Sequence, residues 1–306
     1  MLSSKQKDFI HSVANGTTLP VNSGHMLYVR SLIDGADSPW FVKAHDAELF
    51  TLDKKRDEAL RYLQKESAVY QHLRAQNFEH IPDQHHYQDG VLLLSGLKKE
   101  EGWHWRIPKS SDAETYIKSV LGALDRLQEI SSHEMFDHES SVDFFWQNGW
   151  GSDDSVADAV NSHSHKWSDV LHPGTGKSLA NLARSIDKIR LNEKPDKQGH
   201  ISHHDIRQSN LAWHPVHGTV IIDWSWASHG VQNADATMFL IDLHKSGVDV
   251  TSYLEQYFSE QYAKLLIGYW LLRLGEPTAS GNDEVRLHQL VSAISAFELL
   301  KITKTQ

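Results

Sequence analysis

The first hundred residues alternate apolar and polar positions in a way that predicts strands and one long helix. Residues 26–33 and 40–45 are strand-like, and the turn-forming residues 34–39 (DGADSP) between them predict a hairpin. Apolar residues recur at helical spacing over 57–75, and the run 91–97 (VLLLSGL) has the length of a buried strand. The pattern therefore predicts a small β-rich region that contains one helix.

After residue 97 the pattern becomes mainly helical. Over residues 112–130 the aliphatic positions fall on one face, and Asp112 ahead of them is a suitable N-cap. Residues 178–191 and the stretches towards the C-terminus also have helical spacing. Residues 131–170 are polar, Trp-rich and irregular.

These two patterns predict an α+β fold with two lobes. Residues 1–97 would form a small β-rich lobe, and residues 98–306 would form a larger lobe that is mainly helical. One short strand pair, 211–213 and 219–222, interrupts the helical part. Of the charged side chains, the first range carries 10 basic and 12 acidic (10 − 12 = −2), and the second carries 20 and 28 (20 − 28 = −8).

Composition and charge narrow the function classes. The 306 residues contain no Cys, which excludes a disulfide framework, a thiolate metal site and a cysteine nucleophile. With 30 basic and 40 acidic residues the net charge is −10, which argues against a nucleic-acid partner. Residues 1–16 carry charges where a secretion signal needs an apolar run, and the longest apolar stretch, 265–272, is far shorter than the roughly 20 residues of a membrane-spanning helix. We therefore expect a cytoplasmic protein without a membrane segment.

Residues 201–226 hold the strongest chemical signal. Asp205 and Asn210 precede a predicted hairpin, and Asp223 follows its second, apolar strand. Because a hairpin returns the chain to nearly its starting point, the two carboxylates and the amide are expected to lie close together. Such oxygen ligands suit a Mg²⁺ ion. The alternative is that these Asp and Asn side chains only cap turns, as they often do in loops.

A second signal combines the helix at 57–75 with the strand at 40–45. At 100° per residue, Glu66 falls in the middle of the apolar arc of that helix, where a carboxylate needs a cationic partner. Lys43 shares its strand face with Phe41 and is the candidate partner. Two alternatives stay open: Glu66 reaches solvent from the edge of the arc, or Lys43 is an edge-strand lysine that discourages aggregation.

With these residues in place, the chain resembles the aminoglycoside phosphotransferase and choline kinase-like family, whose fold is that of protein kinases. The resemblance is carried by Lys43, Glu66, residues 203–210 (HHDIRQSN) and residues 221–226 (IIDWSW), and residues 230–235 (GVQNAD) resemble the segment that follows in the family. It implies a small-molecule kinase that uses ATP and Mg²⁺ and transfers the γ-phosphate to a hydroxyl of an aminoglycoside-, choline- or sugar-like acceptor.

The resemblance also implies a role for each matched residue. Lys43 would bind the α- and β-phosphates and Glu66 would hold Lys43, while Asp205 would be the catalytic base. Asn210 and Asp223 would bind Mg²⁺.

Three positions depart from the family pattern. His204 stands where the family usually has Gly, and Arg207 stands where it often has His. The loop at 21–27, which would cover the nucleotide, contains the single glycine Gly24 instead of a glycine-rich pattern.

The acceptor is less clearly marked. The charge of −8 over residues 98–306 fits a cationic small molecule, and the aromatic segment 143–154 (DFFWQNGWGSDD) is a candidate acceptor wall. The alternative is that Phe144, Phe145 and Trp146 pack an irregular loop.

Two other function classes remain as hypotheses. The first is a nucleotide-binding pseudokinase that acts as a scaffold or sensor, favoured only by the weakly marked phosphate loop. The second is a Zn site, suggested by the 21 histidines, but no HExxH pair accompanies them.

Overall fold

The computed structural model describes residues 2–21, 28–35, 38–46, 53–109, 111–133, 135–136, 140–173, 176–277 and 283–304, without the side chains of 20 and 53–55. The chain divides into two compact units. Unit 1 comprises Met1–Ile130 and Ser209–Ala227, and unit 2 comprises Ser131–Gln208 and Ser228–Gln306. We also predict from the resemblance that residues 1–97 are a nucleotide-binding lobe and residues 98–306 a catalytic and acceptor-binding lobe. This division stays a prediction, because it concerns what each part binds and does.

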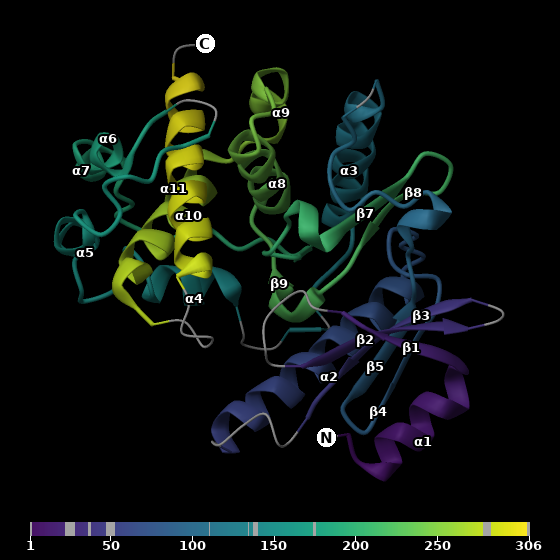
Figure 1. The fold of residues 1–306 in the computed structure, drawn as a ribbon. Helices are drawn as coiled ribbons and strands as arrows, with labels where there is room; N and C mark the ends of the chain where they lie inside the picture. The colour runs from purple at the N-terminus through teal and green to yellow at the C-terminus, as the bar shows by residue number, and fades with distance from the viewer. Residues whose placement is uncertain are drawn as a thin grey trace. The chain divides into compact units, whose positions relative to one another are not determined.

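Unit 1 is built on a five-stranded antiparallel sheet with the order β1-β2-β3-β5-β4 (Figure 1). The strands are β1 (Gly16–Pro20), β2 (Val29–Gly35), β3 (Pro39–Ala44), β4 (His85–Gln88) and β5 (Val91–Ser95). The β2–β3 pairing confirms the predicted hairpin, whose residues 26, 27, 36 and 37 lie outside the described residues. The buried run of β5 confirms the predicted apolar strand.

Helices complete unit 1. They are α1 (Ser4–Val13), α2 (Asp53–Ala75) and α3 (Ala113–Gln128), with single turns at η2 (Lys99–Glu101) and η4 (Trp224–Trp226). Helix α2 contains the predicted helix 57–75 and begins earlier. Helix α3 confirms the helix predicted over 112–130, but its N-cap Asp112 has helical backbone angles and makes no capping hydrogen bond with its side chain. The second hairpin, β7 (Leu211–His214) and β8 (Gly218–Ile221), confirms the predicted strand pair.

Unit 2 is mainly helical. Its helices are α4 (Ser141–Gln147), α5 (Val156–His163), α6 (Leu179–Ala183), α7 (Ile186–Ile189), α8 (Ala234–Lys245), α9 (Leu254–Tyr257), α10 (Glu260–Leu272) and α11 (Glu284–Ile302), with turns η5 (Thr251–Tyr253) and η6 (Arg273–Gly275). The short strands β6 (Ile201–Ser202) and β9 (Ser228–His229) pair antiparallel, and the turn η3 (Gln208–Asn210) lies at the junction of the two units.

Two expectations about unit 2 are wrong in detail. The segment 131–170 is not irregular throughout, because it contains α4 and α5, each capped by a serine hydroxyl that accepts a backbone N–H. The predicted helix 178–191 is two short helices, because Ser185 between them leaves the helical region with φ −122° and ψ 8°. The α+β class itself is confirmed, with a strand-rich first part and a mainly helical later part.

Candidate active site

Lys43 lies at the centre of a buried ion-pair cluster in unit 1. Strand β3 places it between Arg30 of β2 and Leu92 of β5, and its side chain is 3% exposed. Its Nζ donates to Glu66 Oε2 at 2.7 Å and to Asp223 Oδ1 at 2.8 Å. The predicted pairing of Lys43 with Glu66 is therefore confirmed, and Asp223 is a second partner of the same ammonium.

Glu66 is held on the buried face of α2. It is 1% exposed. Of the residues predicted to share its apolar arc, Ala59, Leu63, Tyr70 and Leu73 are fully buried, whereas Tyr62 is half-buried. The Tyr70 hydroxyl donates to Glu66 Oε1 at 3.4 Å and is linked to the backbone of Asp223 by a further hydrogen bond. Burial, together with the neighbouring carboxylates, raises the pKa of Tyr70 well above its usual value, so its hydroxyl keeps its proton.

The electrostatics of the cluster favour a charged lysine. Burial by itself lowers the pKa of Lys43, but the carboxylates of Asp223 and Glu66 outweigh it and raise that pKa above its usual value. The ring of Tyr28 lies 4.8 Å from Nζ, and its hydroxyl donates to the Ala59 carbonyl of α2 at 3.1 Å. Lys43 is thus an ammonium group in position to pair with anions.

The β7–β8 hairpin brings Asn210 and Asp223 to the same end of unit 1. Ile222 N–H donates to the Asn210 carbonyl at 3.0 Å, one residue before Asp223. Asp223 adopts φ 67° and ψ 61°, and its side chain is 29% exposed. Behind it, Trp224 is fully buried, donates to the Ile221 carbonyl at 3.2 Å and packs edge-on against Phe78.

The amide oxygen of Asn210 and the carboxylate of Asp223 are donors of the kind that Mg²⁺ prefers. Among the described residues no cluster of three or more His, Cys, Asp or Glu side chains could hold a metal ion. Mg²⁺ is usually bound by one or two protein side chains plus substrate phosphates, so the assignment of Asn210 and Asp223 to Mg²⁺ stays a prediction that rests on the chemistry of their oxygens. One Asp223 oxygen also accepts from Ser225 Oγ at 3.2 Å, so the carboxylate is oriented from two sides.

Asp205 belongs to unit 2, in the loop that follows β6. Its backbone N–H donates to His203 Nδ1 at 3.1 Å, and its Oδ2 accepts from Arg207 Nη2 at 3.2 Å. The side chain of Asp205 is 24% exposed, and that of Arg207 is 31% exposed. Because Asp205 and Asp223 lie in different units, their expected convergence stays a prediction, while Asn210 and Asp223 do share one hairpin end.

The loop backbone on the N-terminal side of Asp205 is held by Asp235 of α8. The N–H groups of His203 and His204 donate to the two oxygens of Asp235 at 2.7 and 2.8 Å. Burial raises the pKa of Asp235, although these hydrogen bonds and His203 act in the opposite direction. The sequence pattern marked residues 230–235 without giving Asp235 a role.

His204 adopts a backbone conformation that glycine favours. Its φ is 61°, in the left-handed region that favours Gly. The imidazole is buried, with Nδ1 2.7 Å from the Tyr262 hydroxyl and Nε2 3.0 Å from the His229 carbonyl. The loop therefore keeps the glycine-type backbone, and side-chain hydrogen bonds hold it there.

The aromatic segment 143–154 is mainly a packing element. Phe145 is buried against Tyr269 and His204, with ring centroids 4.7 and 6.2 Å away. Trp150 is also buried and donates to the Lys264 carbonyl at 2.7 Å. An acceptor wall at this segment stays a prediction.

Two tyrosines of the unit 1 cluster were not predicted. Tyr70 had a signal, because it lies one turn after Glu66 on the same apolar arc, where its hydroxyl needs a polar partner. Tyr28 follows the loop 21–27, of which residues 22–27, including Gly24, lie outside the described residues.

Comparison with known proteins assigns the family. A family model described as "Phosphotransferase enzyme family" (APH) matches residues 29–266, which include all the predicted site residues. The chain belongs to the phosphotransferase enzyme family. The expected resemblance and the enzyme class are thereby confirmed. The comparison with curated proteins gave no match.

Solved structures share the fold at low sequence identity. The choline kinase LicA from Streptococcus pneumoniae is 12% identical with a TM-score of 0.52, and each chain is covered to 98%. A thermostable mutant of aminoglycoside phosphotransferase APH(4)-Ia, in a ternary complex with ADP and hygromycin B, is 12% identical with a TM-score of 0.57 and covers 98% of this chain and 99% of its own. In the part of this chain that the structure describes, no helix is long and apolar enough to cross a bilayer.

Proposed function

We propose that this phosphotransferase is a small-molecule kinase that moves the γ-phosphoryl group of ATP to an acceptor hydroxyl. The observation that carries the proposal is the buried ammonium of Lys43, held by Glu66 at 2.7 Å and Asp223 at 2.8 Å. Phosphoryl transfer needs a fixed cation for the phosphates and an oxygen ligand for the metal close to it. The Lys43 ammonium and the Asp223 carboxylate, which are hydrogen-bonded to each other, are the groups that we propose for these two tasks.

The proposed roles are those that the family resemblance implies. Lys43 binds the α- and β-phosphates of ATP, and Glu66 keeps its ammonium in place. Among fold relatives, LicA has been solved with AMP, and APH(4)-Ia with AMP-PNP and hygromycin B. These complexes support a nucleotide as the phosphate donor here.

Asn210 and Asp223 are the proposed Mg²⁺ ligands. When bound, the ion would neutralise negative charge on the ATP phosphates. Asp223 already accepts a hydrogen bond from Lys43. With the nucleotide bound, the Lys43 ammonium would therefore contact both the phosphates and the Asp223 carboxylate.

Asp205 is the proposed base. It accepts the proton of the acceptor hydroxyl while the hydroxyl oxygen bonds to the γ-phosphorus and the bond from that phosphorus to the bridging oxygen of ADP breaks. ADP leaves with the electron pair of that bond. A positioned base of this kind contributes about 10²–10⁴ in rate.

For the acceptor we propose a hydroxyl compound of the aminoglycoside, choline or sugar type. The net charge of −8 over residues 98–306, which contain 28 acidic and 20 basic residues, supports a cationic compound. We further propose that residues 1–97 bind the nucleotide and residues 98–306 bind the acceptor.

The decisive experiment is incubation with ATP, Mg²⁺ and a pooled library of hydroxyl compounds, read by mass spectrometry as phosphorylated product. We expect one compound class to gain a phosphoryl group. Asp205→Asn should lower its turnover about 10²–10⁴-fold with ATP binding retained. Asp223→Ala should weaken Mg²⁺-dependent ATP binding itself, and Asp187→Asn, at an exposed position on α7, is the matched control.

Two outcomes would count against the proposal. Near-normal turnover of both site variants would remove the assigned roles. ATP binding without transfer to any compound in the library would favour the pseudokinase alternative.

A further inference from the structure

Helix α8 presents two carboxylates to the loop that carries Asp205. Asp235 and Asp242 are seven residues apart, so they lie on the same face, two turns from each other. Asp235 accepts the backbone N–H groups of His203 and His204, on the N-terminal side of Asp205.

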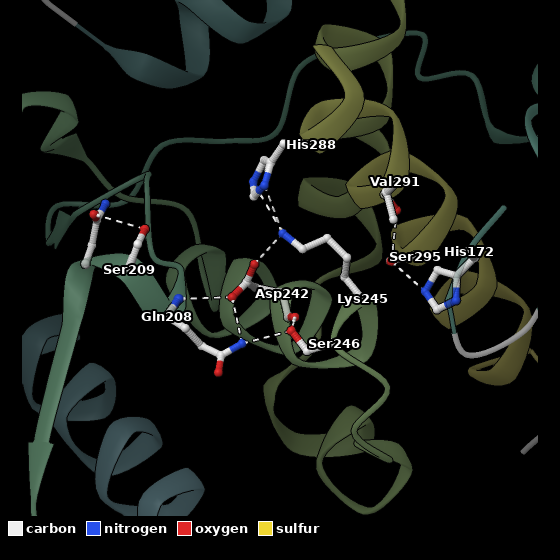
Figure 2. A network of polar contacts seen from close by, with 10 residues as sticks. His172, Gln208, Ser209, Asp242, Lys245, Ser246, His288, Val291 and Ser295 are labelled. Atoms are coloured by element: carbon white, nitrogen blue, oxygen red, sulfur yellow. Dashed lines mark hydrogen bonds and ion pairs between the residues drawn. The ribbon is translucent and has the colours of Figure 1, made fainter. Parts of the chain in front are cut away.

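Asp242 makes the equivalent contact on the other side of Asp205. Its Oδ2 accepts the backbone N–H of Gln208 at 3.0 Å and the side-chain Nε2 of Gln208 at 3.1 Å (Figure 2). The same Nε2 donates to Ser246 Oγ at 3.0 Å. Asp242 and Gln208 are both buried, with 8% and 6% of their surface exposed. Water cannot readily replace these hydrogen bonds, so their loss costs free energy.

We propose that Asp242 is a positioning residue for Asp205, because it fixes the C-terminal side of the loop 203–208 as Asp235 fixes the N-terminal side. The proposal rests on the proposed function in one respect, namely that Asp205 is the base. The proposal goes beyond that function because it assigns a positioning role to Asp242, a residue that does not touch the substrate.

The surroundings of Asp242 keep it an acceptor. Lys245 Nζ donates to its other oxygen, Oδ1, at 2.5 Å. Burial raises the pKa of Asp242, but Lys245 and the bonds from Gln208 outweigh it and lower that pKa below its usual value. Asp242 is therefore a carboxylate, with one oxygen given to the loop and the other to the lysine.

His288 of α11 completes this network. Its ring nitrogens lie 3.2 and 3.4 Å from Lys245 Nζ (Figure 2). Burial, then the charges of Lys245 and Arg207, lower the pKa of His288 to about 4. A neutral ring nitrogen accepts from the ammonium, so Lys245 is itself held between α8 and α11.

The reason to expect a kinetic effect is the shortness of the loop. Asp205 lies between two fixed points only five residues apart, so release of one of them displaces the carboxylate relative to the atoms it serves. A displacement of about 1 Å at a reacting group can lower the rate by about 10².

The test is Asp242→Asn, compared with Lys245→Gln. Asparagine offers one oxygen and a donor NH₂, so the Gln208 bonds and the Lys245 contact cannot all be kept. Lys245→Gln removes the ion pair and leaves both Gln208 bonds to Asp242. We expect Asp242→Asn to lower kcat about 10–100-fold with KM for ATP within about threefold, and Lys245→Gln to change kcat less than about threefold.

A second readout needs no turnover. Amide hydrogen exchange of the peptide 203–210 should be faster in Asp242→Asn than in the parent protein and in Lys245→Gln. Should Asp242→Asn not fold, Gln208→Leu removes only the side-chain donor, and the same faster exchange with about a 3–10-fold lower kcat is expected.

Equal loss of kcat in Asp242→Asn and Lys245→Gln would overturn the proposal, as would unchanged exchange over 203–210. A parent protein that transfers phosphate to no acceptor would count against the proposed function. The exchange experiment would still decide whether Asp242 holds the loop.

Discussion

His204 combines an unfavourable backbone conformation with favourable side-chain contacts. Its left-handed φ of 61° costs a non-glycine residue about 1–2 kcal/mol. Against this, its ring is hydrogen-bonded to Tyr262 and to the His229 carbonyl, both in buried surroundings. The balance of these terms decides how a glycine at this position would change the stability.

We expect His204→Gly to destabilise the protein despite the relief of strain. The Tyr262 hydroxyl would keep only a contact with Met238 Sδ at 3.8 Å, and the His229 carbonyl only a weak bond from Ser228 Oγ at 3.4 Å. Each hydrogen bond lost in these buried surroundings costs about 1–3 kcal/mol, which for two bonds exceeds the strain released. The free energy of unfolding, measured by urea titration, should fall by about 1–4 kcal/mol. A variant more stable than the parent would show that the backbone strain dominates.

The Lys43–Glu66 pair gives a second prediction at the residue scale. Lys43→Met leaves Glu66, only 1% exposed, without its cation, and breaking a buried ion pair in this way costs about 3–5 kcal/mol. Adding Glu66→Gln removes the stranded charge. We therefore expect the double variant to be more stable to urea than Lys43→Met alone, and the prediction is wrong if the double variant is the less stable of the two.

These two residues also show what a sequence reveals about a site. A charged residue in the middle of an apolar arc signals a buried pair, so Lys43 and Glu66 were found from spacing alone. Tyr28 carries no comparable signal, because its contact with Lys43 depends on where the fold places its ring. The second partner of Lys43, Asp223, is 180 residues away in sequence, and pairing over such a distance depends on the fold.

At the scale of elements, the packing of α4 against α10 depends on a glycine. A Cβ on Gly149 would meet the Phe145 carbonyl oxygen at 2.7 Å and the Tyr269 backbone nitrogen at 2.8 Å. Both are backbone atoms, the first of α4 itself and the second of α10, so the segment that follows α4 would have to move away from α10. By contrast, a Cβ on Gly122 of α3 would meet nothing within 4 Å.

We expect Gly149→Ala to lower the free energy of unfolding by about 1–3 kcal/mol through overpacking. The matched variant Gly122→Ala should raise it by up to about 1 kcal/mol, because alanine replaces glycine at an exposed position inside a helix. Thermal or urea unfolding of both variants tests the pair. Equal effects of the two substitutions would contradict the structure.

Element prediction succeeded where the periodic pattern was long. The β2–β3 hairpin, α2, α3, β5 and the β7–β8 hairpin follow from their patterns. The pattern did not reveal α4 and α5, because seven or eight residues give barely two turns of periodicity and their serine caps resemble loop residues. Strands β1 and β4 are short and polar, and their pairing with neighbouring strands defines them.

At the scale of the whole molecule, each compact unit is made of two segments that are separated in the sequence. Residues 209–227 belong to unit 1, although they follow residues 131–208 of unit 2 in the sequence. Sequence patterns predicted the amounts of strand and helix in the two parts, but not this arrangement, because it results from contacts between distant segments. Asn210 and Asp223 therefore join Lys43 and Glu66 in one unit, while Asp205 lies in the other.

Histidines give the molecule a predictable response to acid. Among the described residues, six histidines have pKa values lowered chiefly by burial: His45, His85, His172, His200, His244 and His288. In the unfolded chain a histidine titrates near pH 6.5, so below that pH the unfolded state takes up protons that the folded state does not. Their contribution to stability is full above about pH 6.5 and is lost as the pH falls towards the folded-state values.

His288 provides the sharpest test of this response, because its pKa is lowered to about 4. A difference of that size between the unfolded and folded states corresponds to about 3 kcal/mol at most, lost between about pH 6.5 and pH 4. In His288→Gln the amide oxygen still accepts from Lys245, but the side chain no longer titrates. Urea unfolding at pH 7 and pH 5 should therefore show a smaller loss of stability in the variant than in the parent. The carboxylates with lowered pKa values titrate at lower pH and do not add to the difference over this range. If the parent and His288→Gln lost the same stability between pH 7 and pH 5, His288 would already be charged in the folded protein.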